Sequence, residues 1–444
     1  MLYILFAISA AVVLVLLLLN RVPLSYTVRN LTVRWITSTL TVLAFILVVG
    51  LMVVMLAFTT GMKRMTEGTG EPANVLVLSE GADDEVFSNL DAGDVAEMER
   101  LPLVLRDAGG KRPVASRESY LIINQPVVNP KPGRPQGRFL QIRGVVDVPM
   151  AARVHNMQLL GEGKWFSQAG TQEDPNGNAN AQTLIQVVLG EGVARELAVD
   201  RTPAETAAAH NQQRLDIGDR FTLGRRQCII TGIMKSSGST YNSEVWGKQD
   251  VVAPLFGKNS ITSLVLRTAG AAAAVQLRDD LKNNFKKASV IARLEKDYYA
   301  ALSETSDQFL YSIVFVTAVM AVGGVFGVMN TMFAAISNRI KDIGVMRILG
   351  YARWQILVSF LLESLVIAIV GGLAGCALGT LCNGLSANSM ASSGNGGGKM
   401  VVIELVVDAN IWAAGMLLAV LMGVIGGLAP AISAIRLRLL DALR

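Results

Sequence analysis

Long, uninterrupted apolar runs constrain the fold of this chain more than any other feature of its sequence. Four runs, at residues 36–60, 309–333, 355–382 and 411–433, have the length that a helix needs to cross a bilayer core. A fifth run, at 2–19, is just long enough. The chain has 444 residues, of which 51% are apolar, and its mean hydropathy is +0.43. These values fit a membrane protein with one polar domain better than a soluble protein.

The run at 2–19 has two interpretations. A cleaved signal peptide would need a positively charged start and a small-residue cleavage site, and this run has neither. A retained helix with Arg21 at its cytoplasmic end is the favoured interpretation. Residues 22–36 mix apolar side chains with Arg29 and Arg34, which predicts an amphipathic helix along the inner membrane face.

A polar stretch at 63–304 separates the run at 36–60 from the three later ones. It holds both histidines, most of the acidic residues and no run long enough to span a membrane. Branched apolar runs predict strands at Asn74–Leu78, Leu184–Gly190 and Cys228–Ile233. The stretch exceeds the usual size of a single domain, so we expect one large or two intertwined α+β subdomains.

Six further segments complete the prediction for the polar regions. A short helix is expected at Val193–Leu197, and residues 271–304 are expected to form helices that lead back to the membrane as a stalk. Tracts rich in Gly, Pro and Asn at 129–137 and 170–181 predict surface loops. A Gly/Asn/Ser-rich turn at 383–399 precedes a strand-like piece around Val401–Val407.

A short charged segment joins the apolar runs at 309–333 and 355–382. Its charged residues are Arg339, Lys341, Asp342, Arg347 and Arg353. The apolar residues between them recur at every third position, at Ile340, Ile343, Met346 and Leu349. That spacing predicts a short amphipathic helix within 338–350, which Gly350 would end because glycine tolerates a positive φ. A solvated loop and a helix that docks on a cytoplasmic partner are the two interpretations.

The order of residues favours the docking helix, because the segment resembles the C-terminal part of MacB/FtsX-like ABC transporter permeases (type VII, mechanotransmission type). In that family an Asn, an Arg-x-x-x-Ile-Gly-x-x-x-x-Leu-Gly run and a Gly-Gly-x-x-Gly membrane helix follow one another. The matching residues are Asn330, Arg339, Ile343, Gly344, Leu349, Gly350, Glu363, Gly371, Gly372, Gly375 and Gly379. The arrangement from Tyr26 to Gly61 also resembles the family, and the polar domain resembles it more loosely. The run at 2–19 departs from the usual four-helix pattern.

The resemblance implies a membrane α-helical bundle with a large α+β extracytoplasmic domain inserted between the first and second core helices. The bundle would have four core transmembrane helices plus the extra N-terminal one. The expected parts are an N-terminal helix at 1–20, an elbow and first core helix at 21–62, the extracytoplasmic domain with its stalk at 63–304, and three transmembrane helices with a coupling helix (338–350) at 305–444.

The resemblance also implies a function and a set of partners. The chain would be the permease subunit of an ABC transporter and would not itself be an enzyme. ATP and magnesium would bind to a separate ATPase subunit, and the permease would form a homo- or heterodimer. A peptide, drug, lipid or lipoprotein would be exported or extracted, with a periplasmic adaptor and membrane lipids as further contacts. The alternatives are a non-transporting regulator of a cell-envelope enzyme and, more remotely, a membrane-anchored enzyme.

Two groups of site residues follow. Coupling to the ATPase is assigned to Arg339, Lys341, Asp342, Ile343, Gly344, Arg347, Leu349 and Gly350. Packing within the membrane is assigned to Gly323, Gly327, Glu363, Gly371, Gly375, Gly379, Gly423 and Gly427. The four-residue glycine spacings allow close helix contact and favour a tight bundle that dimerises. Glu363 is a costly intramembrane carboxylate, for which a structural ion pair or hydrogen bond is favoured over a proton path.

Charges near the ends of the apolar runs predict the orientation. One side of the membrane would hold Arg21, Arg29, Arg34, Arg339, Lys341, Arg347, Arg353, Arg436, Arg438 and Arg444. The other side would hold Lys63, Arg64 and Lys399. Ten basic residues against three place the first set in the cytoplasm, which predicts a multi-pass protein of the bacterial inner membrane with its large domain outside.

Several other functions find no support in the sequence. Ser393–Met400 is the nearest approach to a P-loop, but Ser replaces its first glycine and Met its final Ser/Thr, so a flexible turn is predicted. His155 and His210 have no metal-ligand spacing around them and are expected at the surface. The net charge of +5 is small, and no basic block with aromatics predicts a nucleic-acid surface.

Overall fold

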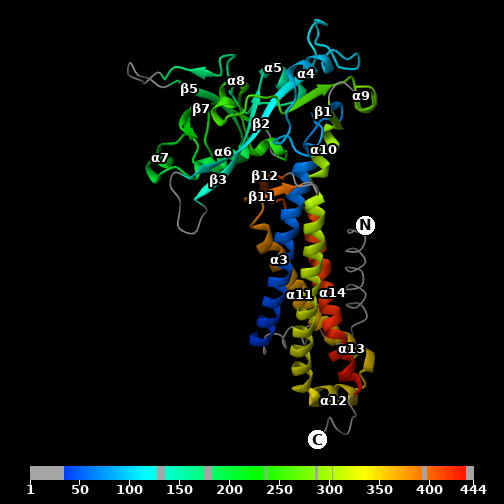
Figure 1. The fold of residues 1–444 in the computed structure, drawn as a ribbon. Helices are drawn as coiled ribbons and strands as arrows, with labels where there is room; N and C mark the ends of the chain where they lie inside the picture. The colour runs from blue at the N-terminus through cyan, green and yellow to red at the C-terminus, as the bar shows by residue number, and fades with distance from the viewer. Residues whose placement is uncertain are drawn as a thin grey trace. The chain divides into compact units, whose positions relative to one another are not determined.

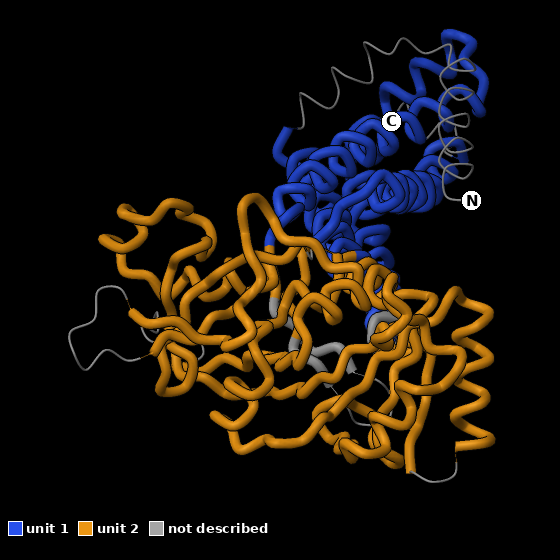
Figure 2. The backbone as a smooth tube through the Cα atoms, turned by 90° about the horizontal axis from the view of Figure 1, so that it is seen from above, with its two compact units in different colours: residues 1–60, 308–385, 405–444 blue, residues 61–307, 386–404 orange. Residues whose placement is uncertain are grey.

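The computed structural model divides the chain into two compact units (Figure 2). Unit 1 comprises residues 1–60, 308–385 and 405–444, and unit 2 comprises residues 61–307 and 386–404. The structure describes residues 35–127, 136–174, 183–235, 238–285, 289–302, 304–392 and 398–436. These ranges leave out the expected helix at 2–19, residues 22–34 of the expected helix at 22–36, the C-terminal tail from 437 and parts of the expected loops. They also leave out Arg21, Arg29, Arg34, Arg438 and Arg444.

The described part of unit 1 contains four long helices (Figure 1). They are α3 (Trp35–Glu67), α11 (Glu304–Ser337), α13 (Arg353–Thr380) and α14 (Ala409–Arg436). Each is long and apolar enough to cross a membrane. They coincide with the four core runs predicted from the sequence, although α3 and α11 extend beyond their runs into unit 2. A short helix, α12 (Ile340–Ile348), connects α11 to α13.

Unit 2 is built on a ten-stranded mixed sheet whose main path runs β10-β1-β9-β2-β3-β8-β5-β7-β6, with β4 beside β5. The strands are β1 (Asn74–Ser79), β2 (Ala115–Pro126), β3 (Gly137–Val145), β4 (Thr171–Gln172), β5 (Leu184–Gly190), β6 (Arg220–Leu223), β7 (Arg226–Met234), β8 (Glu244–Lys248), β9 (Ser263–Arg267) and β10 (Val290–Leu294). The pairs β3–β8 and β5–β7 are parallel and the other pairs are antiparallel. The three predicted strands are confirmed as β1, β5 and β7.

Short helices surround the sheet, and two hydrophobic cores lie against it. The helices are α4 (Ala92–Met98), α5 (Val148–Val154), α6 (Glu191–Ala198), α7 (Pro203–Ala208), α8 (Gln249–Val252), α9 (Ala271–Asn284) and α10 (Glu295–Ala301), with 3-10 turns η1 (Thr240–Ser243) and η2 (Pro254–Phe256). One core gathers side chains of β5, β7, β8 and α6, and the other gathers side chains of β1, β9, α4 and α9. Both cores lie in one compact unit, and the predicted helix at Val193–Leu197 lies within α6.

The structure differs from the prediction in two segments of unit 2. Residues 290–294 form an edge strand, β10, where helices were expected throughout 271–304, because β1 offers them an antiparallel partner. Residues 386–404 form a hairpin of β11 (Ser386–Ser392) and β12 (Gly398–Glu404) and belong to unit 2 rather than to the membrane segment. Val401 and Ile403 of β12 are buried, and the Val402 N–H donates to Ser243 Oγ of η1 at 2.7 Å.

Candidate functional site

The charged segment folds as the short helix α12, and its end is determined by backbone geometry. Gly350 has φ +95°, a conformation that side-chain-bearing residues rarely adopt. The Gly350 N–H donates to the Arg347 carbonyl at 3.2 Å, and the Tyr351 N–H donates to the Met346 carbonyl at 3.1 Å. This pair of bonds is the Schellman arrangement that ends a helix. The predicted stop at Gly350 is therefore present.

One side of α12 packs inward and the other carries exposed apolar side chains. Ile343 and Gly344 are buried, and Ile343 packs in a cluster with Ile336 of α11 and Phe360 of α13. The exposed side chains are those of Lys341, Asp342, Val345, Ile348 and Leu349, the last three with 50%, 60% and 71% of their surface accessible.

The expected stripe of apolar residues at every third position does not hold along the whole segment. Leu349, six residues after Ile343, lies about 120° away from it around a 3.6-residue helix. Leu349 is also the C-cap residue, beyond the last helical residue. Its exposed side chain therefore belongs with Val345 and Ile348 and not with the buried face.

A buried ion pair holds the start of α12 against α13. Arg339, the N-cap residue of α12, donates from Nη1 to Glu363 Oε2 at 3.0 Å and from Nη2 to Glu363 Oε1 at 3.4 Å. Both residues are buried, with 7% and 5% of their surfaces exposed. A two-pronged guanidinium–carboxylate contact fixes orientation as well as distance. Glu363 therefore takes part in a structural ion pair, and its partner is Arg339.

Five of the seven predicted packing glycines lie at close helix contacts within unit 1. A Cβ added to Gly371 would lie 2.5 Å from Phe45 Cβ, one added to Gly375 would lie 3.0 Å from Val49 Cβ, and one added to Gly379 would lie 2.5 Å from Val53 Cγ1. These three glycines thus form the surface on which α3 lies against α13. Gly423 and Gly427 of α14 face α13 in the same way, next to Ala368 and Ser364.

The other two predicted glycines make no such contact. Gly323 and Gly327 of α11 are exposed, and a Cβ added to either would meet nothing within 4 Å. Their neighbour Gly324 makes the contact with α14, where an added Cβ would lie 2.2 Å from Met422 Cε. The spacing alone could not show which glycine of α11 faces inward, because Gly323 and Gly324 are adjacent.

Unit 2 contains a buried ion cluster around Arg143 that the sequence did not predict. The Arg143 guanidinium donates to Glu244 at 2.7 and 2.8 Å and to Glu85 at 2.8 Å, and it also pairs with Glu118. All four side chains are fully buried. Such a cluster requires nearly complete pairing, because an unpartnered charge in the interior is very costly. The strand itself gives little local signal, because β3 also contains Arg138 and Gln141.

His155 extends this cluster, so the prediction that it lies at the surface was wrong. Its Nε2 pairs with Glu118, and its Nδ1 lies 3.1 Å from Glu295 Oε1 and 2.8 Å from the Tyr241 hydroxyl. Burial alone would lower the pKa of His155, but the two carboxylates raise that pKa to about 10. Burial likewise favours neutral Glu118, but His155 and Arg143 lower the pKa of its carboxyl to about 2. His210 is exposed, as expected.

The sequence could not reveal these partners because they lie 37 and 140 residues from His155 along the chain. Among the described ranges of the chain, no group of three or more His, Cys, Asp or Glu side chains could hold a metal ion.

Comparison with known families agrees with this architecture. Residues 38–284 match the MacB-like periplasmic core domain, and residues 314–439 match the FtsX-like permease C-terminal domain. The chain therefore belongs to the family of MacB/FtsX-like ABC transporter permeases. Together with the four apolar helices, this makes it a membrane protein with a large domain outside the bilayer.

Among individual proteins, the chain is similar to the macrolide export ATP-binding/permease protein MacB of Bdellovibrio bacteriovorus. The two are 24% identical over 455 residues, covering 94% of this chain and 60% of that protein. An uncharacterized ABC transporter permease of Bacillus subtilis, YknZ, is 29% identical over 246 residues, covering 51% of this chain and 57% of YknZ. The chain thus spans about 60% of the length of these relatives.

A solved structure also shows a weak likeness. The periplasmic region of MacB from Actinobacillus actinomycetemcomitans aligns with 55% of this chain and 94% of that one, at 13% identity and a TM-score of 0.32.

Proposed function

We propose that this chain couples ATP hydrolysis by a separate ATPase subunit to movement of unit 2, and that α12 is the element on which the ATPase docks. The observation that carries the proposal is the exposed apolar surface of Val345, Ile348 and Leu349 next to the charges of Lys341 and Asp342. An apolar centre with a charged rim is typical of a protein docking surface.

The contacts of α12 are suited to transmitting force. Arg339 ties its first residue to Glu363 of α13, and the buried Ile343 packs between α11 and α13. A push on the exposed side would therefore move α11 and α13 with α12, since the ion pair and the packing of Ile343 join the three helices. ATP and magnesium would bind to the partner ATPase, because the two family matches describe permease and periplasmic regions.

The family membership supports the remaining parts of the proposal. We place the chain in the bacterial inner membrane as one of two permeases over two ATPases, with export or extraction of a peptide, drug, lipid or lipoprotein as the outcome. A periplasmic adaptor and membrane lipids would be further contacts. A regulator of a cell-envelope enzyme, driven by the same movement, is the alternative, and the co-purifying proteins would distinguish the two.

Substitution of Leu349 by Glu tests the docking surface without disturbing the core of unit 1, since Leu349 is 71% exposed. We expect the ATPase subunit to be lost from the gently purified complex, with at least a ~30-fold weaker affinity, the effect of losing an apolar hot spot worth about 2 kcal/mol. Val199→Glu, at an apolar residue of unit 2 that is 39% exposed, is the matched control.

The measurement is the ATPase-to-permease ratio by mass spectrometry, together with the ATP hydrolysis rate of the complex. Gly344 is a poorer test position, because it is buried and its substitution would also disturb packing. If the Leu349→Glu and Ile348→Glu variants both retain the ATPase, α12 is a solvated connection between two membrane helices and not a docking element.

A further inference from the structure

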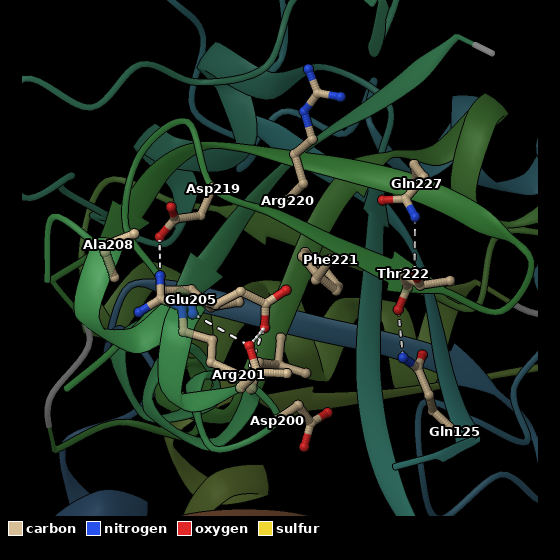
Figure 3. A pocket seen from close by; sticks show the side chains of 14 residues that line it. Gln125, Asp200, Arg201, Glu205, Ala208, Asp219, Arg220, Phe221, Thr222 and Gln227 are labelled. Atoms are coloured by element: carbon tan, nitrogen blue, oxygen red, sulfur yellow. Dashed lines mark hydrogen bonds and ion pairs between the residues drawn. The ribbon is translucent and has the colours of Figure 1, made fainter. Parts of the chain in front are cut away.

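A cavity of about 530 Å³ lies at one end of the sheet in unit 2 (Figure 3). The segment from α6 to α7 forms one wall, and the edge strand β6 forms another. Leu197 and Leu215 are buried at its base, and Phe221 of β6 is half-buried. The side chains of Phe221 and Glu205 point toward the middle of the cavity, whereas Arg220 points away from it (Figure 3).

The pairing of β6 shows that part of its backbone faces outward. β6 ends the sheet among the described strands and pairs only with β7, with Phe221 opposite Cys228 and Thr222 opposite Gln227. In this antiparallel hairpin, alternate residues direct their N–H and C=O groups away from the partner strand. The outward residues are Arg220 and Thr222, because the Gln125 side-chain amide donates to the Thr222 carbonyl.

Gln125 covers only one end of this edge. Its Nε2 group donates to the Thr222 carbonyl, and its Oε1 atom accepts from the Gly224 N–H at 3.4 Å. Within the described ranges, the Thr222 N–H and both backbone groups of Arg220 have no hydrogen-bond partner. Three consecutive outward groups (N–H, C=O and N–H) therefore stay available to an added strand, and unpaired edges of this kind readily accept one.

Among the described residues, one carboxylate that lines the cavity forms no ion pair. Arg201 pairs with Asp219 at 2.5 Å, Asp200 pairs with Arg138, and Arg220 pairs with Asp174 at 2.8 Å. Glu205 is the lining carboxylate without such a pair, and the charge of Arg201 acts on it only from a greater distance.

Glu205 is also the best-placed group to receive a ligand. One of its oxygens, Oε2, accepts from the Thr202 N–H at 2.7 Å and from the Thr202 hydroxyl at 2.9 Å, an arrangement that lowers the pKa of the Glu205 carboxyl. The other oxygen, Oε1, has no partner in the part of the chain that the structure describes. A negative group with an apolar neighbour, Phe221, suits the charged end and the aliphatic stem of a basic side chain.

We propose that β6 and this cavity bind an extended segment of another polypeptide, which adds a strand beside Arg220 and Thr222 and places a Lys or Arg side chain in the cavity against Glu205. The added strand would end at Thr222, where Gln125 occupies the carbonyl. The backbone contacts supply affinity for any extended chain, and Glu205 selects a basic residue. This interaction is independent of ATPase docking on α12.

The test uses the full chain in nanodiscs of zwitterionic lipid and a fluorescein-labelled peptide of seven residues that alternates valine and lysine. Binding is measured by anisotropy, and hydrogen exchange follows the Arg220 and Thr222 amides. We expect saturable binding with slower exchange at both amides. A peptide that alternates valine and glutamate, and a valine–lysine peptide N-methylated at alternate residues, should each bind at least fivefold more weakly.

Two pairs of variants separate the backbone contact from the charge contact. Thr222→Pro removes an outward N–H, which an edge strand tolerates, and also the hydroxyl that accepts from Gln227 Nε2 at 3.1 Å. It should weaken binding about threefold to tenfold, whereas Thr222→Val, which lacks the same hydroxyl but keeps the N–H, should not. Glu205→Gln keeps the capping arrangement with Thr202 but removes the charge, and should weaken binding and its salt dependence. Glu173→Gln, at a nearby carboxylate outside the lining, is the charge control.

Three results would overturn the proposal. They are equal binding of the N-methylated peptide, unchanged binding by both Thr222→Pro and Glu205→Gln, and protection of the β6 amides by self-association of the protein without peptide. The first two would exclude strand addition and charge selection, and the third would make a second copy of this chain the occupant. None of these results depends on whether the ATPase copurifies.

Discussion

His155 carries a positive charge where no water can reach it. The carboxylates of Glu118 and Glu295 on either side of its ring replace the lost hydration, and the Tyr241 hydroxyl completes the contacts. Through these bonds one ring joins strand β2 to the first residue of α10. The charge is therefore a structural link between the sheet and the segment that leads to α11.

The pH dependence of stability should report this link. The pKa of His155 in the folded protein, about 10, lies above its ordinary value of 6.5. Its contribution is therefore complete below pH 6.5 and is lost as the pH rises toward 10, by an amount on the order of a few kcal/mol. Glu118, with its pKa lowered to about 2, contributes above pH 4.5 and loses that contribution as the pH falls toward 2.

We expect the melting temperature of unit 2, followed by tryptophan fluorescence, to be highest between about pH 4.5 and 6.5. His155→Gln should melt lower at pH 6 and show a flatter decline between pH 6.5 and 10. His210→Gln, at the exposed histidine, should melt like the unmodified protein. An unchanged slope in His155→Gln would show that another group titrates in this range.

The structural role of a single residue could be predicted when that role depends only on its neighbours in the sequence. Gly350 was predicted as a helix stop because a helix end is a local event, and the structure gives it a positive φ. Arg143 and His155 could not be predicted, because their partners come from other strands and helices. Nothing within a few residues of either one distinguishes a buried pair from a solvated charge.

At the scale of elements, the contact between α3 and α13 depends on the glycines on one face of α13, at positions 371, 375 and 379. A Cβ on Gly375 would lie 3.0 Å from Val49 Cβ, 3.1 Å from the Ile46 carbonyl oxygen and 3.2 Å from the Gly50 nitrogen. Two of these atoms belong to the backbone of α3 and can yield only if the helices separate.

Gly375→Val should therefore lower the thermal stability of unit 1 by about 1–3 kcal/mol, the usual cost of overpacking. Gly323→Val is the matched control, because a Cβ there meets nothing within 4 Å. Both variants are measured by thermal unfolding in the same detergent. If both variants lower the stability equally, the close contact between α3 and α13 is not the reason why residue 375 is a glycine. Loss of dimers by Gly323→Val, without a lower melting temperature, would assign that face of α11 to a second permease.

The elements that could be predicted are those with a strong periodic or compositional signal. Hydropathy placed all four long helices, and branched apolar runs placed β1, β5 and β7. Strand β10 was missed because a segment of five residues next to two helices has too short a pattern to show its own period. Its conformation depends on the free edge of β1, a tertiary contact.

At the scale of the whole molecule, the hairpin β11–β12 gives unit 2 a connection to α13 and α14 in addition to those through α3 and α11. Its last residue, Glu404, pairs with Arg195 of α6, which also pairs with Glu191 at 2.8 Å. The chain passes between the two units four times. Unit 2 is therefore linked to each of the four long helices.

Glu404→Arg should loosen this hairpin by placing two like charges together. We expect hydrogen exchange of the β12 amides to become about threefold to tenfold faster, because a partly exposed ion pair contributes about 0.2–1 kcal/mol and like charges add a similar penalty. The double variant Arg195→Glu/Glu404→Arg should restore slow exchange, and Glu191→Gln should change it little. No change in Glu404→Arg would show that the pairing with β11, the bond to Ser243 and the buried apolar side chains hold the strand without the ion pair.

The general plan of the molecule was predictable from the positions of its apolar runs, but the place of residues 386–404 was not. The turn and strand-like character of this segment were visible, yet its assignment to unit 2 depends on contacts with η1 and α6, some 150 to 210 residues earlier in the chain. A sequence pattern of this length carries no information about so distant a partner.

Unit 2 is made of two separate segments of the chain, and this imposes an order on its biosynthesis. Its first part is complete when residue 307 has been made, but its second part is complete only when β12 ends at residue 404, after two further membrane helices. At ~5–20 residues per second the ribosome needs about 5–20 s for those 97 residues. During that interval the surfaces of η1 and α6 that receive the hairpin stay uncovered on the far side of the membrane. The nascent protein thus passes through a stage in which unit 2 has its large sheet but not yet its last two strands.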